Sequence, residues 1–249
     1  MLKKERQAII LHMLDLHNKV VSLSLSKELS VSEDTIRRDL QQLADQGRCT
    51  KVHGGALSLA FNGYQTIPNQ VYSKTHKGTI AQKALKLIRN NMVILTTGGT
   101  TILELTRHIP HDLHATIFTG SIPVVNACLS HPGLKVVIIG DELSKDSKIT
   151  IGPQAIRQIG EINADLCFLG TNALDDEKGV TENDWQVAQV KKAMVASSKK
   201  VVSMIISEKL NTVQPIQICG LESIDYLITE LDPKDEKLIP FYKPELNIL

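Results

Sequence analysis

Apolar residues near the start of the chain recur at the spacing typical of helices. The period over residues 3–16 follows a charged first turn and predicts a helix that Asn18 breaks. Residues 24–29 favour a brief second helix. From Ser32 onward, apolar positions four and three residues apart predict a longer third helix, which Gly47 ends as a C-terminal cap. The chain therefore begins with a helix, a short helix, a turn and a long helix.

The third predicted helix combines a start signal with a pair of exposed arginines. Ser32 is a preferred N-cap residue, because its oxygen can accept a hydrogen bond from a free backbone N–H of the first turn. The apolar stripe through Ile36 and Leu40 leaves Arg37 and Arg38 off the buried face. An ordinary amphipathic helix with solvated arginines explains the same pattern. The neighbouring elements have to distinguish this interpretation from a binding role for the arginines.

The elements around the third helix favour DNA binding. Their order is that of a helix-turn-helix, in which the last helix lies in the major groove. Residues 48–53 then alternate as a strand does, and Gly54-Gly55 marks a turn, so we expect a basic β-hairpin, or wing. There Arg48, Lys51 and His53 can contact phosphates or the minor groove, although His53 also fits a hydrogen-bonded turn residue.

From residue 77 the pattern changes to helices alternating with short apolar strands. A helix is expected over 77–89, and apolar runs of strand length follow it. These runs are 92–95, 115–119, 134–139, 166–169, 201–206 and 226–229. Near-continuous apolar strands separated by helices predict an α/β fold with a Rossmann-like, doubly wound parallel sheet. Ligands of such sheets bind beyond the carboxyl ends of the strands.

The loop over 96–101, Thr-Thr-Gly-Gly-Thr-Thr, is the strongest candidate for a phosphate site. Gly98 and Gly99 allow the backbone to approach an anion, and Thr100 and Thr101 offer hydroxyl groups. The helix that follows presents free N–H groups and the positive end of its dipole. A tight strand-to-helix turn without a ligand explains the same residues.

The stretch over 58–75 has little periodicity and predicts a linker. It would separate a winged helix-turn-helix domain over 1–57 from an effector-sensing domain over 76–249. A chain of 249 residues has room for roughly two domains of about 100 to 200 residues each.

The overall composition permits DNA binding without demonstrating it. The chain is 42% hydrophobic and 22% charged with a net charge of +1, which is ordinary for a globular protein. Its four cysteines are widely spaced, which favours free thiols in a reducing cytoplasm over a disulfide framework. No run approaches the roughly 18 apolar residues of a membrane span, so we expect a cytoplasmic protein with no membrane partner.

The motifs of the N-terminal part resemble one known family. Ser-Glu-Asp-Thr-Ile-Arg-Arg-Asp-Leu over 32–40, then Leu43, Gly47 and Lys-Val-His-Gly-Gly-Ala over 51–56, is similar to the signature of the DeoR family of bacterial sugar-metabolism repressors. That family uses the region as a winged helix-turn-helix. The resemblance implies DNA contacts for Ser32, Thr35, Arg37, Arg38, Lys51 and His53.

The resemblance continues through the second domain. Lys-x-x-Ile-Ala over 77–81 and Thr-Gly-Ser-Ile-Pro over 119–123 match the family's sensor domain, whose fold is similar to ribose-5-phosphate isomerase. Its usual ligand is a phosphorylated sugar, bound without a cofactor. The implied effector-binding residues are Thr97, Gly98, Gly99, Thr100, Thr101, Ser121, Gly140, Asn172, Lys191 and Lys209. Lys191 and Lys209 would bind the phosphate, although each also fits an ordinary surface lysine.

The chain departs from the family where side chains would contact sugar hydroxyls. Thr96 and Gly120 stand where the family often has an aspartate and an asparagine, and Asn172 and Ile206 stand where it commonly has acidic residues. The identity of the sugar is therefore left open.

Two other constellations suggest weaker roles. His108, His111 and His114 are three residues apart, but Pro110 lies among them and indicates a loop, so no metal site is expected. Trp185 opens a predicted helix, where packing is the expected role.

Three functions are consistent with these observations. The leading hypothesis is a repressor of sugar metabolism or transport genes that binds a double-stranded operator as a homodimer or homotetramer and responds to a phosphorylated sugar. A sugar-phosphate isomerase with a DNA-binding appendage competes with it. Asn172 and Ala173 stand where that fold would supply an acidic group, which argues against an enzyme. The third is a constitutive DNA-binding protein with a degenerate sensor.

Overall fold

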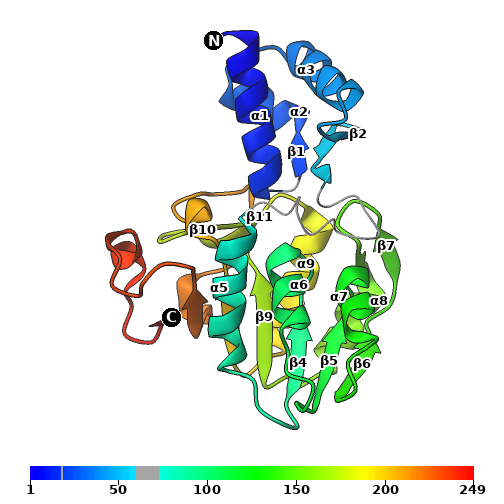
Figure 1. Cartoon of the computed structure of the whole chain (residues 1–249), viewed down its shortest axis with the longest axis vertical. Coiled ribbons are helices and arrows are strands. Elements are labelled where there is room, and N and C mark those ends of the chain that lie inside the picture. Colours follow the sequence, from blue (N-terminus) through cyan, green and yellow to red (C-terminus); the bar gives the residue numbers. More distant parts are fainter. Residues whose placement is uncertain (18, 60–72) are drawn as a thin grey trace. The chain divides into compact units, whose positions relative to one another are not determined.

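The computed structural model describes residues 1–17, 19–59 and 73–249, and the chain divides into two compact units (Figure 1). The first unit comprises residues 1–74 and the second 75–249. Most of the expected linker, from 60 to 72, lies outside the described residues.

The N-terminal unit contains three helices and a small antiparallel sheet. The helices are α1 (Lys3–His17), α2 (Ser22–Glu28) and α3 (Glu33–Asp45), and the strands are β1 (Lys19–Val21), β2 (Thr50–Val52) and β3 (Gly55–Leu57), in the order β1-β3-β2. All three predicted helices are present, with α2 beginning two residues earlier than expected. Gly55 is required where β3 passes β1, because a Cβ there would lie 1.9 Å from the carbonyl oxygen of Val20. The β2–β3 hairpin is the predicted wing.

The core of this unit is built from the apolar stripes that the sequence pattern predicts. Ile36, Leu40 and Leu43 of α3 are at most 2% exposed and pack with Ile10 and Leu14 of α1. One face of α3 is thereby committed to the core, and the opposite face is left for a partner.

The second unit is organised on a seven-stranded sheet in which all neighbouring strands run parallel. Its strands are β4 (Val93–Thr96), β5 (Ala115–Thr119), β6 (Leu134–Ile138), β9 (Leu166–Gly170), β12 (Val201–Met204), β14 (Tyr226–Ile228) and β15 (Asn247–Ile248), in the order β15-β14-β12-β9-β4-β5-β6. The six predicted strands are confirmed within a few residues, and β15 is an addition. The predicted α/β fold class is confirmed.

Helices cover both faces of this sheet. They are α5 (Lys74–Leu85), α6 (Thr100–Arg107), α7 (Ile122–Cys128), α8 (Pro153–Gly160) and α9 (Trp185–Ala196). Leu95 and Leu169 pack in one cluster with residues of α8 and α9. Side chains alternate along a strand, so Ile94 and Phe168, also buried, face the other side, where Figure 1 shows α5 and α6. Burial on both faces explains why these strands are apolar throughout.

Smaller elements that the sequence pattern did not predict surround the main sheet. A second, antiparallel sheet has the order β10-β11-β13, formed by β10 (Ala173–Asp175), β11 (Gly179–Glu182) and β13 (Ile216–Cys219). β7 (Glu142–Ser144) pairs with β8 (Ile149–Ile151), and short 3-10 turns occur at η2 (Ser207–Lys209), η3 (Leu221–Ser223) and η4 (Glu236–Phe241). None of the helices in the described part of the chain has the length and apolar content needed to cross a membrane.

Candidate functional site

The helix α3 begins with a cap formed by its own sequence. The Ser32 hydroxyl oxygen accepts a hydrogen bond from the Thr35 backbone N–H at 3.2 Å, and the two hydroxyl groups lie 2.8 Å apart. Glu33 and Asp34 place negative charge at the positive end of the helix dipole. The start of the helix is therefore complete before any partner binds.

The two arginines of α3 lie in different electrostatic surroundings. The Arg37 side chain is 58% exposed and pairs with Glu33 at 2.8 Å and Asp34 at 3.9 Å. Arg38 is exposed and forms no ion pair with another described residue. Arg38 is thus ready to contact an anion, whereas Arg37 must first exchange its carboxylate partners.

A buried charge fixes α3 against α1. Asp39 is 2% exposed and accepts hydrogen bonds from the Arg6 side chain and from Gln7. Gln7 also donates to Gln42, one turn further along α3, at 3.0 Å. Sequence reasoning singled out neither Arg6 nor Asp39. A carboxylate on the buried face of a helix is costly unless a cation pairs with it. The position of Asp39 on that face could therefore have predicted a buried ion pair.

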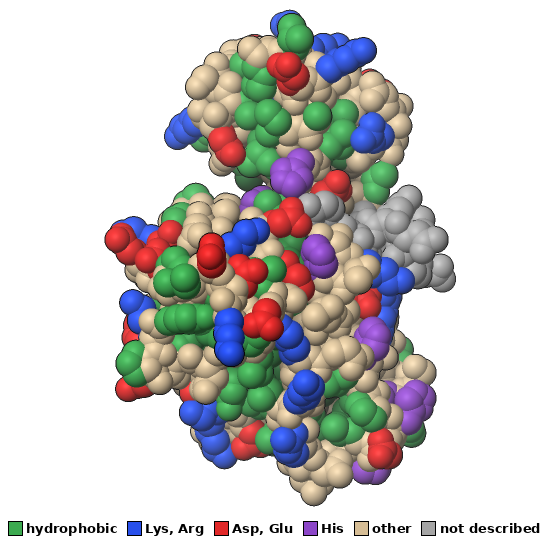
Figure 2. Space-filling model, turned by 60° about the vertical axis from the view of Figure 1, so that its left-hand side comes forward, with side chains coloured by type: hydrophobic (Ala, Val, Ile, Leu, Met, Phe, Trp, Pro, Cys, Tyr) green, Lys and Arg blue, Asp and Glu red, His purple; other side chains and the backbone are tan. Residues whose placement is uncertain are grey.

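The wing lies beside α3. Lys51 donates from Nζ to the Gln41 side chain at 2.7 Å, which joins β2 to the exposed face of α3. His53 is exposed where the hairpin turns. Figure 2 shows Lys and Arg side chains dispersed over the visible surface among acidic ones, as the near-neutral net charge implies. Specific placement, rather than a general positive field, has to supply DNA recognition.

In the second unit, the predicted loop over 96–101 joins β4 to α6 at the carboxyl edge of the sheet. The Thr97 hydroxyl accepts a hydrogen bond from the Gly170 N–H at 2.8 Å and lies within hydrogen-bonding distance of the Phe168 carbonyl. Thr97 therefore joins β4 to β9, and its hydroxyl is already engaged.

The glycines of this loop bring the backbone close to its surroundings. A Cβ at Gly98 would lie 2.9 Å from Ile149 and 3.1 Å from the Ser121 hydroxyl. Gly99 has a φ of 108° and stands at the N-cap of α6 without a side chain that accepts a hydrogen bond. Thr100 is buried and Thr101 is half-buried in the first turn of the helix.

The open start of α6 contrasts with those of the two helices on the opposite face. Asp141 accepts from the Gln154 N–H at 2.7 Å at the start of α8, and Asp184 accepts from Gln186 and Val187 at the start of α9. Those positive ends are occupied by carboxylates of the chain itself, whereas the end of α6 lacks such a partner among the described residues.

Two buried hydroxyl groups beside this loop lack hydrogen-bond partners. The Thr96 hydroxyl, at the end of β4, and the Ser121 hydroxyl, after β5, are both fully enclosed without a partner in the described part of the molecule. A buried polar group without a partner costs roughly 1–3 kcal/mol. Both hydroxyl groups lie beside the uncapped start of α6, but protein atoms enclose them.

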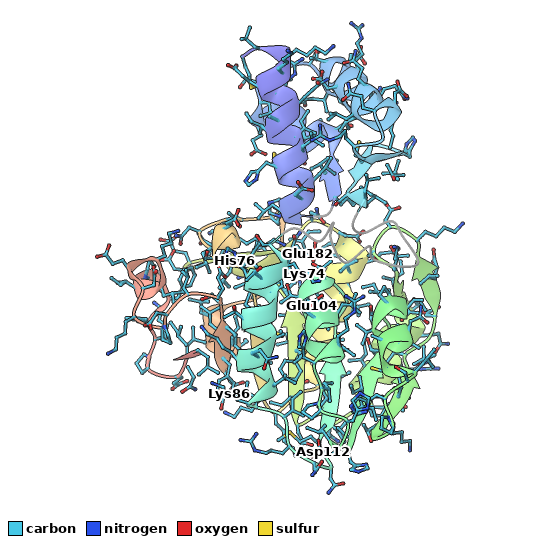
Figure 3. All side chains as sticks on the ribbon, in the orientation of Figure 1. Lys74, His76, Lys86, Glu104, Asp112 and Glu182 are labelled. Carbon is cyan, nitrogen blue, oxygen red and sulfur yellow. The ribbon has the colours of Figure 1, made fainter. Side chains whose placement is uncertain are left out.

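Three lysines gather at the same edge of the sheet. Lys77 of α5, Lys191 of α9 and Lys209 of η2 are 4%, 6% and 8% exposed, and each of the first two lies near enough to Lys209 to repel its charge. Glu182 of β11 is the buried carboxylate among them, and Figure 3 shows it at the upper edge of the second unit, above Glu104 on α6. Lys77 and Lys191 repel the charge of Lys209, whereas Glu182 and Glu208 attract it.

The buried position of Lys209 lowers the pKa of its ammonium group. Burial, followed by repulsion from Lys77, lowers this pKa to about 7, although Glu182 acts in the opposite direction. An anion bound nearby would restore the charged form of Lys209.

Glu182 is held as an ionised acceptor. Burial raises its pKa, but the charge and hydrogen bond of Lys191, at 2.7 Å, and donation from Asn183 and Asn172 bring the pKa below its usual value. Lys191 also donates to the Gly170 carbonyl at 3.0 Å. Asn172, where the family often has an acidic residue, thus lies beside a carboxylate that comes from β11 instead.

The structure does not bring all predicted residues into this cluster. Gly140 follows β6 at the sheet edge, and its N–H and C=O are both bonded to the Gln158 side chain, at 3.0 and 3.2 Å. The residues that sequence reasoning missed are Glu182, and Lys77 as a member of the site. Lys77 was named only as part of a family motif. Its position on the buried face of a helix could have predicted that it belongs to the site.

The histidines of 108–114 do not form a metal site in the described residues. His108 bonds through its ring to the Glu104 carbonyl at 2.7 Å, and the His111 ring packs near that of His131. Trp185 is 64% exposed, so the expected packing role is wrong: it lies at the first position of α9, on the outer side of the helix.

Comparison with known families gives two matches that together span most of the chain. Residues 6–60 match the DeoR-like helix-turn-helix domain, and residues 73–231 match the DeoR C-terminal sensor domain.

Curated relatives are similar over nearly their whole length. The HTH-type transcriptional regulator GlpR of Haloferax volcanii is 35% identical over 83% of this chain and 82% of its own. GolR of Listeria innocua, another HTH-type transcriptional regulator, is 30% identical over 91% and 90%. The HTH-type transcriptional repressor GlcR of Bacillus subtilis is 26% identical over 94% and 90%.

Similar solved structures are more distant. Ribose 5-phosphate isomerase A of Methanocaldococcus jannaschii is 16% identical, with a TM-score of 0.40, over 54% of this chain and 53% of its own. The tetrameric eIF2B-β2-δ2 complex of C. thermophilum has a chain that is 12% identical, with a TM-score of 0.48, over 68% and 61%.

Proposed function

The chain belongs to the DeoR family of transcriptional regulators, and we propose that it represses genes of sugar metabolism or transport until a phosphorylated sugar binds its sensor. The family membership confirms the resemblance in the sequence signature and makes the chain a DNA-binding regulator. The effector, the residues that contact it and the sense of regulation are the proposal.

One observation carries the effector proposal. Lys209 is buried, and Lys77 and Lys191 repel its charge in a place where charge is poorly screened, so an anion bound beside Lys209 would stabilise its charged form. A phosphate ester carries about −1.5 to −2 charges at neutral pH and can supply that negative charge. The phosphate would be bound by Lys209 and the N–H groups at the start of α6.

The neutral part of the effector would meet groups that recognise hydroxyls. Glu182 offers a carboxylate acceptor, and Asn172 offers an amide beside it. A sugar hydroxyl both donates and accepts, so it can satisfy such groups in pairs. This favours a phosphorylated sugar over inorganic phosphate.

The DNA-binding unit would act through α3 and the wing. Arg38 and, once released from its carboxylates, Arg37 would read bases in the major groove, with Ser32 and Thr35 near the start of the helix. Lys51 and His53 would contact the backbone. Half-sites lie about 34 Å apart, so two copies of the chain are needed. The effector would favour an assembly with the wrong spacing.

We propose that the sensor does not turn over its ligand. Enediol chemistry requires a general base, and Glu182 is the buried carboxylate that lies beside Lys191. Three donors and a lowered pKa make Glu182 a weak base. Incubation with ribose 5-phosphate tests this directly: isomerisation that Glu182→Gln abolishes would establish an enzyme instead.

A thermal-shift screen followed by DNA binding tests the regulatory proposal. The full chain is heated with a panel of sugar phosphates, the parent sugars and inorganic phosphate, and each stabilising compound is added to the complex with the gene's own promoter. We expect one phosphorylated sugar to raise the Tm and release the DNA. Lys209→Met should lose both responses, and Lys243→Met, an exposed lysine elsewhere, should keep them. Release of DNA by none of the compounds would favour the constitutive alternative.

A further inference from the structure

Lys209 of the effector cluster lies on a turn that another side chain holds in place. The turn η2 spans Ser207–Lys209, and a single 3-10 turn has poor hydrogen-bond geometry of its own. Glu230, which follows β14, accepts hydrogen bonds from the Ser207 backbone N–H at 3.0 Å and from the Ser207 hydroxyl group. The direction in which η2 presents Lys209 therefore depends on a carboxylate from another part of the chain.

The Glu230 carboxylate is enclosed and has neighbours from two elements. Its side chain is 8% exposed, and its Oε1 atom lies 3.8 Å from the Nδ1 atom of His76 on α5. The Lys83 ammonium group, also on α5, is near enough to be attracted by it. Such donors and charges stabilise a carboxylate that is removed from water. Glu230 thus connects η2 with α5.

α5 also binds the backbone on both sides of Glu230. Lys83 donates from Nζ to the carbonyl oxygens of Thr229 and Leu231, at 2.9 and 2.6 Å. Burial lowers the pKa of Lys83, whereas Asp232 and Glu230 act in the opposite direction. The backbone around Glu230 is bonded to α5 and its carboxylate is bonded to η2, so a movement of η2 acts on α5 through this residue.

The first turn of α5 interacts with η2 a second time, through charge. Lys77, next to His76, repels the charge of Lys209. An anion bound beside Lys209 attracts both ammonium groups, so it replaces this repulsion with a shared attraction. Phosphate binding therefore changes the force between η2 and the start of α5, the same two elements that Glu230 joins.

The start of α5 coincides with the division between the two units of the chain. α5 begins at Lys74, and the boundary falls between residues 74 and 75. Figure 3 shows Lys74 and His76 at one end of the helix and Lys86 at the other. The end of α5 that carries Lys77 is thus the end from which the chain continues to the DNA-binding unit.

We propose that Glu230 is a positioning residue for Lys209. Together with His76 and Lys83, it transmits phosphate binding at η2 to the start of α5. The effector favours the arrangement in which η2 and the first turn of α5 approach each other, and regulation requires such unequal binding to two arrangements. The regulatory consequence rests on the proposed function, since it needs an effector phosphate at Lys209.

Thermal-shift titration of the full chain with inorganic phosphate, at constant ionic strength, tests the positioning role. Glu230→Gln should weaken phosphate binding about tenfold, because η2 loses a charged acceptor. Loss of a negative charge alone would strengthen the binding of an anion, so the sign of the effect identifies positioning. Ser207→Ala should weaken binding in the same way, and Ser207→Thr, which retains the hydroxyl group, should restore it.

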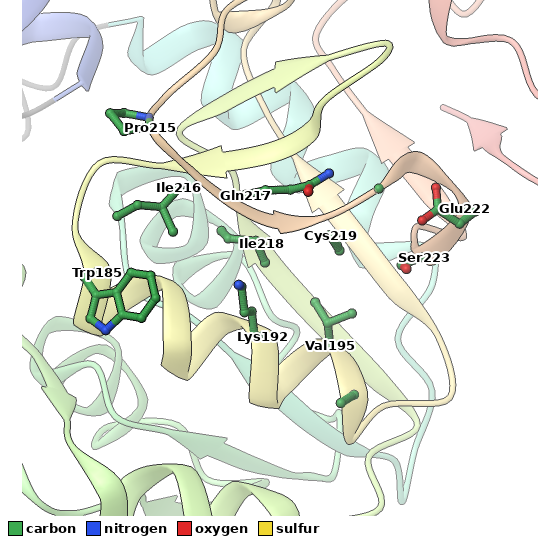
Figure 4. Close-up of a pocket in the computed structure, with 12 residues that line it drawn as sticks. Trp185, Lys192, Val195, Pro215, Ile216, Gln217, Ile218, Cys219, Glu222 and Ser223 are labelled. Atoms are coloured by element: carbon green, nitrogen blue, oxygen red, sulfur yellow. The ribbon is translucent and has the colours of Figure 1, made fainter.

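Two lysine variants serve as references for these titrations. Lys209→Met should remove the specific response. Lys192→Met is the matched control, because Lys192 follows Lys191 on α9 but lines a hollow of about 640 Å³ between α9 and β13. Figure 4 shows its side chain between Trp185 and Glu222. We expect Lys192→Met to bind phosphate as the parent does.

Hydrogen exchange in the same samples measures the transmission to α5. In the parent, phosphate should slow amide exchange over residues 77–82 about threefold or more, because tighter packing suppresses local opening. Lys83→Met should lose this slowing in α5 and still bind phosphate, since its link to the backbone around Glu230 is removed. Lys86→Met, an exposed lysine on the same helix, should behave as the parent.

The possible failures are distinguishable. Phosphate binding in Glu230→Gln that equals or exceeds that of the parent would overturn the positioning role, and if that variant does not fold, equal binding by Ser207→Ala and Ser207→Thr would do so. Slowing in α5 that persists in Lys83→Met would overturn the transmission. A response that survives in Lys209→Met would overturn the phosphate site of the proposed function, and the role of Glu230 with it.

Discussion

The two helices on which the proposed function depends, α3 and α6, begin in opposite ways. At the start of α3, the Ser32 hydroxyl accepts a backbone hydrogen bond, and acidic residues follow it. At the start of α6, Gly99 supplies no side chain, and the unpartnered hydroxyls of Thr96 and Ser121 lie nearby. A helix that presents side chains to DNA can be complete in itself, whereas a helix that binds an anion must leave its positive end open.

The largest effect is expected from the exposed face of α3. Arg37→Ala with Arg38→Ala should weaken binding to the promoter about 100-fold or more, since each base contact contributes roughly 1–3 kcal/mol. The melting curve should hardly change, because both side chains are exposed. Electrophoretic mobility shifts measure the affinity, and Lys3→Ala with Lys4→Ala, on α1, removes the same charge as a control. A large fall in Tm would show that the arginines are structural.

Changes at the start of α6 should weaken effector binding and spare DNA binding, unlike the changes in α3. Gly99→Val places a β-branched residue at a φ of 108°, and Thr100→Ala changes the first helical residue with little strain. Both should weaken effector binding, by about tenfold for Thr100→Ala if one hydrogen bond to a charged group is lost, and leave DNA affinity unchanged. Calorimetric titration with the effector from the thermal-shift screen measures this.

Gly140→Ala is the matched control for the α6 variants. A Cβ at Gly140 meets nothing within 4 Å, and the backbone groups of this residue are bonded to Gln158. We expect an unaltered response. A response lost in Gly140→Ala but kept in Thr100→Ala would move the phosphate site from the start of α6 to the end of β6.

The contrast between α3 and α6 also explains what the sequence could predict. The signals for α3 lie within one stretch of chain: the cap, the acidic first turn, the apolar stripe and the terminal Gly47. The parallel strands could be predicted equally well, because burial on both faces makes each of them continuously apolar. Both predictions rest on local pattern.

The effector cluster could be predicted only in part, because its members meet through tertiary structure. Lys77, Lys191 and Lys209 come from α5, α9 and η2, and Glu182 comes from a strand of the unpredicted second sheet. No spacing in the sequence connects these residues. Family resemblance pointed to Lys191 and Lys209, but it missed Glu182, since the family often supplies its acidic group elsewhere. The exposed Trp185 was misjudged because its helix was predicted without the neighbouring strand edge.

The protonation of Lys209 gives a smaller, graded effect that is confined to the sensor. Its pKa of about 7 in the free protein should rise when phosphate binds, so binding takes up a proton above pH 7. Phosphate esters, with a second pKa of about 6, stay dianionic there. Effector affinity should therefore fall between pH 7.5 and 9, by up to about tenfold per pH unit.

The variant Lys209→Met isolates this proton. It should bind the effector more weakly, with an affinity that is flat over the same pH range, while DNA affinity in the absence of effector keeps the pH dependence of the parent. The stability of the free sensor has the opposite sign: between pH 7 and about 10 the unfolded chain binds more protons, so stability rises with pH. An effector affinity that falls equally in Lys209→Met would assign the proton to another group.

The smallest effect is expected where α3 restrains its own arginine. Glu33→Gln removes the carboxylate that pairs with Arg37 at 2.8 Å, and an exposed pair four residues apart contributes about 0.3–0.5 kcal/mol. Promoter affinity should rise about twofold at low salt, and the gain should vanish as salt screens the pair. Glu28→Gln, at the end of α2, removes the same charge. It should therefore raise only the nonspecific affinity, which is the same for promoter DNA and for unrelated DNA. An equal gain in both variants would mean that Arg37 is not held back by Glu33, and that α3 presents both arginines to DNA without rearrangement.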